Sequence, residues 1–215
     1  KSNEIICQEL TTSYPNIPIM SEENQQIKYE IRKNWEYYWC IDPIDGTKEF
    51  IKKNDEFTVN IALIHKNIPV LGVVYAPALN EMYYAKQNEG AFKNGQKLPL
   101  QMNSNLTEKL TVVASKSHLS PQTQDFIDNI DTKEITQVSR GSSLKLCMVA
   151  EGSADIYPRL APTMEWDTAA ADAIVRESGK MSYQYNTDKP IDYNKKNLLN
   201  PWFVCKAVTI IKEEI

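Results

Sequence analysis

Between residues 39 and 50 the chain carries the stretch Trp39-Cys40-Ile41-Asp42-Pro43-Ile44-Asp45-Gly46-Thr47-Lys48-Glu49-Phe50. Pro43 fixes its own φ and biases the preceding residues toward extended backbone, so we expect a strand to end here. Gly46 permits a turn that other residues resist, and Thr47 favours the start of a helix. The stretch therefore predicts a rigid elbow that presents Asp42 and Asp45 beside backbone amides, which suits divalent cations and a phosphate group. An ordinary acidic turn has the same composition and is the alternative.

Two further acidic segments lie far from this elbow. Ser21-Glu22-Glu23-Asn24 follows an apolar run, and Glu165-Trp166-Asp167-Thr168-Ala169-Ala170 opens an alanine-rich helix. If Glu22, Asp42, Asp45 and Asp167 converge, each pair at about 4 Å repels by roughly 4 kcal/mol at an effective dielectric near 20. Such a cluster binds protons or cations, and a ligand set made only of oxygen favours magnesium over zinc. Taken singly, Asp167 could instead cap its helix, and Glu22 could be a solvated surface charge.

Together the three segments resemble the magnesium-dependent, lithium-sensitive phosphomonoesterases typified by inositol monophosphatase. The resemblance implies an α/β fold, a five-layer α-β-α-β-α sandwich with the metal site between its halves. It implies two or three Mg²⁺ ions, held by Glu22, Asp42, the backbone carbonyl of Ile44, Asp45 and Asp167. Thr47, Glu22 and Asp45 are then expected to be catalytic, and the Gly46 and Thr47 amides to contact the phosphate.

In that family an aspartate from the N-terminal segment works with the threonine on the attacking water. Here it would fall before Lys1, where the chain is expected to begin partway through a helix. This keeps open a second interpretation from another class, a metal- or nucleotide-binding module without turnover.

The composition excludes several other classes of protein. The 215 residues are 42% hydrophobic and 24% charged, with a net charge of −4 and no basic block, which argues against a nucleic-acid polymer as partner. The four cysteines are widely spaced, so we expect neither zinc nor disulfides, and a reducing cytoplasm is the simplest location. No apolar stretch approaches 18 residues, so no integral membrane segment is expected. Peripheral association with a membrane and the choice between monomer and homodimer stay open.

The pattern of elements divides the chain into two halves. Residues 1–105 are expected to form an antiparallel-sheet half that binds the metal, with strands at 39–41, 57–63, 69–76, 81–86, 90–92 and 97–100 and a hairpin turn at Asn94-Gly95. Residues 106–215 alternate strand and helix and are expected to form an α/β half that binds the substrate. Its predicted strands are 110–114, 134–138 and 154–157, and its helices begin at Ser120-Pro121, Ser142 and Asp167.

The second half supplies candidate residues for substrate choice. Lys145 interrupts the otherwise apolar helix 142–151, where a lysine more often reaches out to the surface. It follows Gly141-Ser142-Ser143, a region suited to an anion. Arg159 lies at a strand end, and His118 follows a strand where ligand-binding loops gather in α/β proteins.

These segments resemble the 3'(2'),5'-bisphosphate nucleotidase branch of the family. The similarity covers Ser-x-Ser-His, Gly-Ser-Ser-Leu-Lys-x-Cys through Tyr-Pro-Arg, Trp-Asp-Thr-Ala-Ala and the segment Pro190-Ile191-Asp192-Tyr193. It implies hydrolysis of adenosine 3',5'-bisphosphate to AMP and phosphate. The nucleotide and its 5'-phosphate would be held by His118, Ser142, Lys145 and Arg159. The reacting phosphate would contact Glu22, Ile44, Asp45, Gly46, Thr47 and Asp167. A sister activity on inositol phosphates is the alternative within the family.

Overall fold

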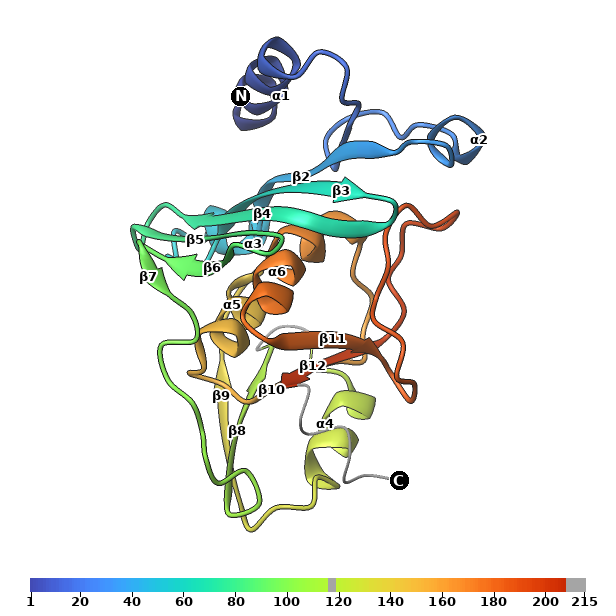
Figure 1. Cartoon of the computed structure of the whole chain (residues 1–215). Coiled ribbons are helices and arrows are strands. Elements are labelled where there is room, and N and C mark those ends of the chain that lie inside the picture. The colour runs from blue at the N-terminus through green and yellow to red at the C-terminus, as the bar shows by residue number, and fades with distance from the viewer. Residues whose placement is uncertain (116–118, 208–215) are drawn as a thin grey trace.

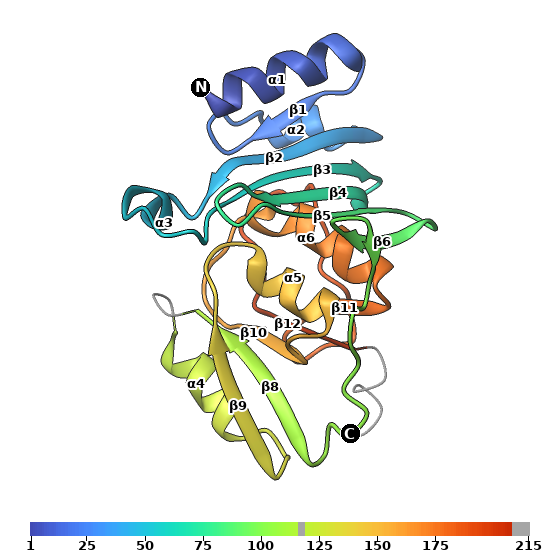
Figure 2. The same cartoon turned by 90° about the vertical axis from the view of Figure 1, so that its left-hand side faces the viewer.

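The computed structural model describes residues 1–115 and 119–207, and it consists of five layers of helix and sheet. Helices α1 (Ser2–Ser13) and α2 (Tyr29–Arg32) lie outside a seven-stranded sheet. Helices α5 (Leu144–Glu151) and α6 (Glu165–Glu177) separate it from a five-stranded sheet, and α4 (Pro121–Asp128) covers the outer face of that second sheet (Figures 1 and 2). This confirms the predicted α-β-α-β-α order. Within the described residues, no helix is long and apolar enough to cross a membrane.

The seven-stranded sheet follows chain order. Its strands are β1 (Ile19–Ser21), β2 (Tyr37–Asp45), β3 (Thr58–His65), β4 (Ile68–Ala76), β5 (Glu81–Lys86), β6 (Gly90–Lys93) and β7 (Gln96–Lys97). Only the β1–β2 pair is parallel. Buried and half-buried residues alternate along β3, as expected for a strand with one face on the core. The Asn94-Gly95 turn joins β6 to β7, and both residues have positive φ, which confirms the hairpin.

Two of the strand boundaries that differ from the prediction lie beside prolines. Strand β2 does not end at Pro43 but continues to Asp45 across a bulge between Asp42 and Asp45. Pairing with β1 stops at Ile41, so Pro43 lies where no ladder hydrogen bond is needed on that side, a position at which a strand tolerates proline. The strand expected at 97–100 is limited to β7, because Pro99 has no amide hydrogen to donate.

The five-stranded sheet has the order β11 (Lys180–Gln184), β12 (Phe203–Ala207), β10 (Ile156–Arg159), β8 (Lys109–Ala114), β9 (Glu134–Ser139). Strands β8, β9 and β10 are parallel, and β12 is antiparallel to both of its neighbours. The predicted start of α4 is confirmed, since Ser120 caps it by accepting a hydrogen bond from the Thr123 amide, and Pro121 follows.

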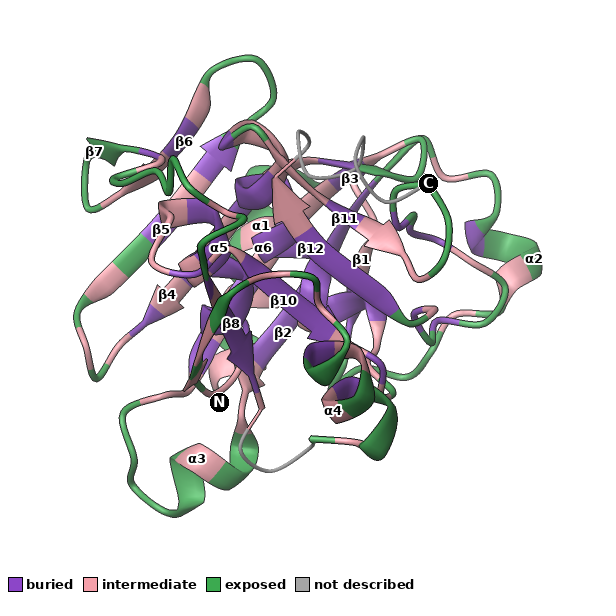
Figure 3. Ribbon diagram, turned by 90° about the horizontal axis from the view of Figure 1, so that it is seen from below, coloured by how far each residue is buried: buried purple, intermediate pink, exposed green. Residues whose placement is uncertain are grey.

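The central helix α6 packs closely against the first sheet. A Cβ atom added at Gly72 of β4 would lie 2.1 Å from the Ala170 carbonyl oxygen, so only glycine fits there. One apolar cluster joins buried residues of both sheets with those of α5 and α6, and the centre of the molecule is buried while α3 (Thr47–Ile51) and β7 are not (Figure 3). Each half contributes one sheet, and the division into a metal-binding and a substrate-binding half stays a prediction.

Candidate active site

A cavity of about 960 Å³ opens where the end of β2 meets the starts of α3, α5 and α6 and the end of β10. It brings together eight of the residues singled out in the sequence: Glu22, Asp45, Gly46, Thr47, Ser142, Lys145, Arg159 and Asp167. Asp42 and Ile44 lie behind this lining, on β2. His118 lies outside the described residues. The cavity thus collects side chains from segments more than a hundred residues apart.

Carboxylates from three segments form one wall of the cavity. Asp42 is 1% exposed, and its burial, followed by the charges of Asp45 and Glu22, raises its pKa to about 10. Burial and then the charge of Asp45 raise the pKa of Asp167 to about 7. The parts of these upward shifts that come from neighbouring carboxylates require the groups to be close, because like charges disfavour each other's ionised form. The expected convergence of the acidic residues is therefore present.

Protein donors hold one oxygen of each aspartate. Oδ1 of Asp42 accepts the Ile44 amide at 3.0 Å, and Oδ2 of Asp45 accepts the Ser143 hydroxyl at 2.9 Å. Oδ2 of Asp167 accepts the Met164 amide at 2.8 Å, because Asp167 is the third residue of α6 and not its cap. The hydrogen bonds that Asp45 and Asp167 accept from described residues all reach Oδ2, so Oδ1 of both is left for another partner.

The oxygen atoms of the acidic wall suit a hard divalent cation, although their side chains are not arranged around a single point. Among residues 1–115 and 119–207, no three His, Cys, Asp or Glu side chains are arranged as ligands of a single ion. The four acidic side chains Glu22, Asp42, Asp45 and Asp167 nevertheless offer only oxygen, which is the ligand type of Mg²⁺ and Ca²⁺. A cation would also neutralise the repulsion that raises the pKa of Asp42 and Asp167. The residues fit a metal ion chemically, and ligation by three of them together requires side-chain rotation.

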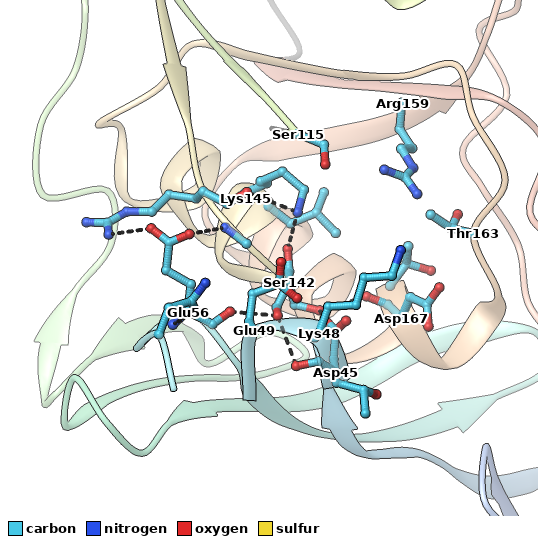
Figure 4. A pocket seen from close by; sticks show the side chains of 18 of the residues that line it. Asp45, Lys48, Glu49, Glu56, Ser115, Ser142, Lys145, Arg159, Thr163 and Asp167 are labelled. Carbon is cyan, nitrogen blue, oxygen red and sulfur yellow. Dashed lines mark hydrogen bonds and ion pairs between the residues drawn. The ribbon is translucent and has the colours of Figure 1, made fainter. Parts of the chain in front are cut away.

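Cationic side chains form the opposite wall. Lys145 is only 6% exposed, so it is not the surface lysine that composition favours, and its ammonium donates to the Ser142 carbonyl at 2.6 Å. Burial lowers the pKa of Lys145 to about 8. Arg159 donates from Nη2 to the Pro162 carbonyl at 2.8 Å, while its buried Nε has no partner in the described part of the chain. Figure 4 shows both groups directed into the cavity, with Lys48 extending from α3 toward Asp167.

Ser142 joins the two walls at the floor of the cavity. Its hydroxyl lies 2.9 Å from the Asp45 carbonyl and 2.7 Å from the Glu56 carbonyl, and its φ is +49° (Figure 4). A Cβ atom at Gly46 would come within 2.2 Å of this hydroxyl, so the elbow requires glycine both for its φ of +85° and for space. The hydroxyl of Ser142 is therefore engaged with backbone, and its expected contact with a nucleotide stays a prediction.

Sequence reasoning missed three residues of the site. Ser143 contacts Asp45, Glu56 accepts the Gly141 amide at 2.9 Å, and Lys48 reaches into the cavity. The doubled serine before an apolar helix was a usable signal for Ser143. Lys48 and Glu56 carry no such signal, since charged residues beside a loop are ordinarily solvated.

Comparison with known proteins agrees with this geometry. The inositol monophosphatase family matches the chain over residues 1–208. The 3'(2'),5'-bisphosphate nucleotidase CysQ of Salmonella typhimurium is 43% identical over 203 residues, covering 94% of this chain and 80% of the relative. CysQ of Haemophilus influenzae is 39% identical over 211 residues, covering 94% and 76%.

Solved structures give the same result. CysQ from Bacteroides thetaiotaomicron, a bacterial member of the inositol monophosphatase family, superposes with a TM-score of 0.87 at 41% identity, covering 94% of this chain and 81% of that one. Inositol monophosphatase II from Staphylococcus aureus shares the fold at 23% identity, with a TM-score of 0.80 and coverage of 99% and 81%. Because the family model matches residues 1–208, nearly the whole chain, the protein belongs to the inositol monophosphatase family.

Proposed function

We propose that this protein is a magnesium-dependent 3'(2'),5'-bisphosphate nucleotidase that hydrolyses adenosine 3',5'-bisphosphate to AMP and phosphate. Curated relatives that carry this enzyme name are 38–43% identical over most of the chain. The observation that carries the proposal is the cavity with two walls of opposite charge, formed by Asp45 and Asp167 on one side and Lys145 and Arg159 on the other.

A substrate with two phosphate groups explains both walls. The phosphate that reacts must sit beside carboxylates, which only a bridging cation allows. The second phosphate needs fixed positive charge at a distance from the first, and Lys145 and Arg159 supply it. An inositol monophosphate has one phosphate group and would leave the cationic wall without a partner. The geometry therefore supports a substrate with two phosphate groups over an inositol monophosphate, and the names of the curated relatives favour the nucleotide.

On the acidic wall we propose that Glu22, Asp42, Asp45 and Asp167, together with the Ile44 carbonyl, hold two or three Mg²⁺ ions. Bound Mg²⁺ supplies the charge that activates water and stabilises the leaving oxygen in phosphoryl transfer. Asp45 is well suited to this role, because the hydrogen bond from Ser143 fixes Oδ2. Support for Asp42 comes from its burial, since a carboxylate held so far from water needs a compensating charge.

Thr47 and Gly46 are proposed to orient the reacting groups. Thr47 is exposed at the first position of α3 and lines the cavity next to Asp45. Its hydroxyl can position a water for attack, and we propose that the backbone amides of the elbow contact the phosphate. Glu22 directly follows β1, which pairs with one edge of β2 while β3 pairs with the other, and its exposed carboxylate lines the cavity. We propose that Glu22 receives a proton from the attacking water.

On the cationic wall we propose that Lys145, Arg159 and Ser142 bind the nucleotide and its 5'-phosphate, with His118 as a further ligand. Buried cations bind phosphate strongly, because little water competes with the anion. Arg159 uses Nη2 for the Pro162 carbonyl, and its guanidinium has further donors that a phosphate oxygen could accept from. We further propose a cytoplasmic enzyme, which agrees with the four free cysteines, and a monomer or homodimer, which light scattering would distinguish.

A phosphate-release panel in Mg²⁺ tests the proposal. We expect the highest kcat/KM on adenosine 3',5'-bisphosphate, a lower value on adenosine 3'-phosphate, and little release from inositol 1-phosphate or fructose 1,6-bisphosphate. Lithium should inhibit and calcium should antagonise magnesium. Preferred release from inositol 1-phosphate would reassign the enzyme to the inositol phosphatases, and nucleotide binding by calorimetry without any release would show a binding module.

A further inference from the structure

Ser143 occupies the N-cap position of α5 but does not cap that helix. Serine is favoured there because its hydroxyl can accept an amide of the first turn. The Ser143 side chain accepts none of these amides, and it is only 3% exposed. Its hydroxyl is instead turned away from its own helix and toward the acidic wall.

The hydroxyl connects three elements of the site. It lies 2.9 Å from Oδ2 of Asp45 on β2 and 2.7 Å from the Asp167 carbonyl oxygen on α6. Asn60 of β3 donates to it from Nδ2 at 2.9 Å. Strand β2 and helix α6 carry the two aspartates that line the cavity, and the buried Ser143 oxygen lies between these two elements.

The direction of these hydrogen bonds follows from the chemistry of the groups. Nδ2 of Asn60 also faces Oδ2 of Asp45 at 3.4 Å, and an ionised carboxylate can only accept, so the amide nitrogen and not its oxygen must lie on this side. The Ser143 oxygen therefore accepts from Asn60, and its single proton is left for Asp45 and the Asp167 carbonyl. Asn60 leaves its own buried Oδ1 without a partner among the described residues to keep this arrangement.

We propose that Ser143 is a positioning residue for metal binding, acting through Asp45 and the first turn of α6. By holding Oδ2 of Asp45, it leaves Oδ1 as the oxygen that can turn toward a cation. By contacting the Asp167 carbonyl, it sets the distance between α6 and β2. Groups that hydrogen-bond to the ligands of a metal ion orient those ligands and strengthen binding in this way. The inference rests on the proposed magnesium-dependent hydrolysis.

The test compares Ser143→Ala with Ser153→Ala in the whole protein. Ser153 lies just beyond the other end of α5, where its hydroxyl donates to Glu151 at 2.6 Å, away from the cavity, so it is a matched control for the loss of one serine hydroxyl. Mg²⁺ binding is measured by calorimetry without substrate, with kcat, KM and the melting temperature alongside. For Ser143→Ala we expect Mg²⁺ affinity to fall about tenfold to hundredfold. We also expect a lower kcat, a nearly unchanged nucleotide KM at saturating Mg²⁺, and a melting temperature close to that of Ser153→Ala.

Wild-type Mg²⁺ affinity in Ser143→Ala would overturn the inference. So would an equal loss of affinity in both variants, because the effect would then not be local. If Ser143→Ala does not fold, Ser143→Cys keeps the shape with a weak donor, and it must lose affinity at an unchanged melting temperature for the inference to stand. A wild-type protein that binds no Mg²⁺ or releases no phosphate would instead contradict the proposed function itself.

Discussion

The two walls of the cavity are built in different ways. The acidic wall is carried by the bulged strand β2, the start of α6 and Glu22 beyond β1; Asp42 is buried, Asp45 and Asp167 are half-buried, and backbone or hydroxyl donors hold all three aspartates. The cationic wall is carried by a helix start and a strand end of the other sheet, where Arg159 is half-buried. Carboxylates crowd the acidic wall, whereas the cationic wall has two side chains, Lys145 and Arg159, that can donate further hydrogen bonds.

This difference indicates a division of tasks. Crowded carboxylates with raised pKa values are costly unless a cation binds, so the acidic wall is suited to the reaction. Separate, directional cations are suited to recognising a distant anion. We therefore expect substitutions in the acidic wall to lower kcat, and substitutions in the cationic wall to raise KM for the bisphosphate.

The largest effect is expected for Asp45→Asn. The change removes a proposed metal ligand, so kcat should fall on the order of 10³-fold in phosphate release. In the metal-free protein the melting temperature should rise, because the charge of Asp45 contributes to the raised pKa of both Asp42 and Asp167. Those pKa values lie above the unfolded ones, so stability is lost as pH rises toward them, and the gain from Asp45→Asn should be larger at pH 8 than at pH 5.

Asp128→Asn is the control for this comparison, because Asp128 is an exposed carboxylate at the end of α4, remote from the cavity. It should leave kcat and the melting temperature unchanged. Retained activity in Asp45→Asn would contradict the role given to the acidic wall.

The second effect is expected for Arg159→Met on the cationic wall. The KM for adenosine 3',5'-bisphosphate should rise about tenfold to hundredfold, since a hydrogen bond to a charged group contributes about 1.5–3 kcal/mol. The KM for adenosine 3'-phosphate, which lacks the second phosphate, should change little. Equal effects on the two substrates would show that Arg159 does not contact the 5'-phosphate.

The same contrast separates what the sequence could predict from what it could not. Periodicity and turn signals located most strands, and Ser120-Pro121 located the start of α4. The continuation of β2 through Pro43 depends on where β1 stops pairing, a contact that local sequence does not contain. Motifs predicted the convergence of the acidic residues, whereas the burial of Lys145 and the contacts of Ser143 arise only when α5 packs against α6 and the second sheet with its start beside β2.

The third effect is a dependence of KM on pH. Lys145 has a folded-state pKa of about 8, lowered by burial, so it loses its charge as pH rises through 8. The KM for adenosine 3',5'-bisphosphate should rise several-fold between pH 7.5 and 9.5, with a smaller change in kcat. Lys145→Arg stays charged over this range, so its KM should be flat even if it is higher at pH 7.5. A flat profile in the wild type would mean that the phosphate does not depend on the charge of Lys145.

The smallest effect is expected at the rim between the walls, where Arg140 pairs with Glu56 at 3.2 Å. The Arg140 side chain is 44% exposed, so the pair should contribute only about 0.5 kcal/mol, and Arg140→Ala should change kcat and KM by about twofold or less. Glu56→Ala should have a larger effect, because it also removes the acceptor of the Gly141 amide, which positions Ser142 and Ser143. Measuring kcat and KM of both variants on adenosine 3',5'-bisphosphate separates the effect of the exposed Arg140–Glu56 ion pair from that of the hydrogen bond between the Gly141 amide and Glu56. Equal losses in the two variants would mean that Arg140 itself contacts the nucleotide, which would extend the cationic wall beyond Lys145 and Arg159.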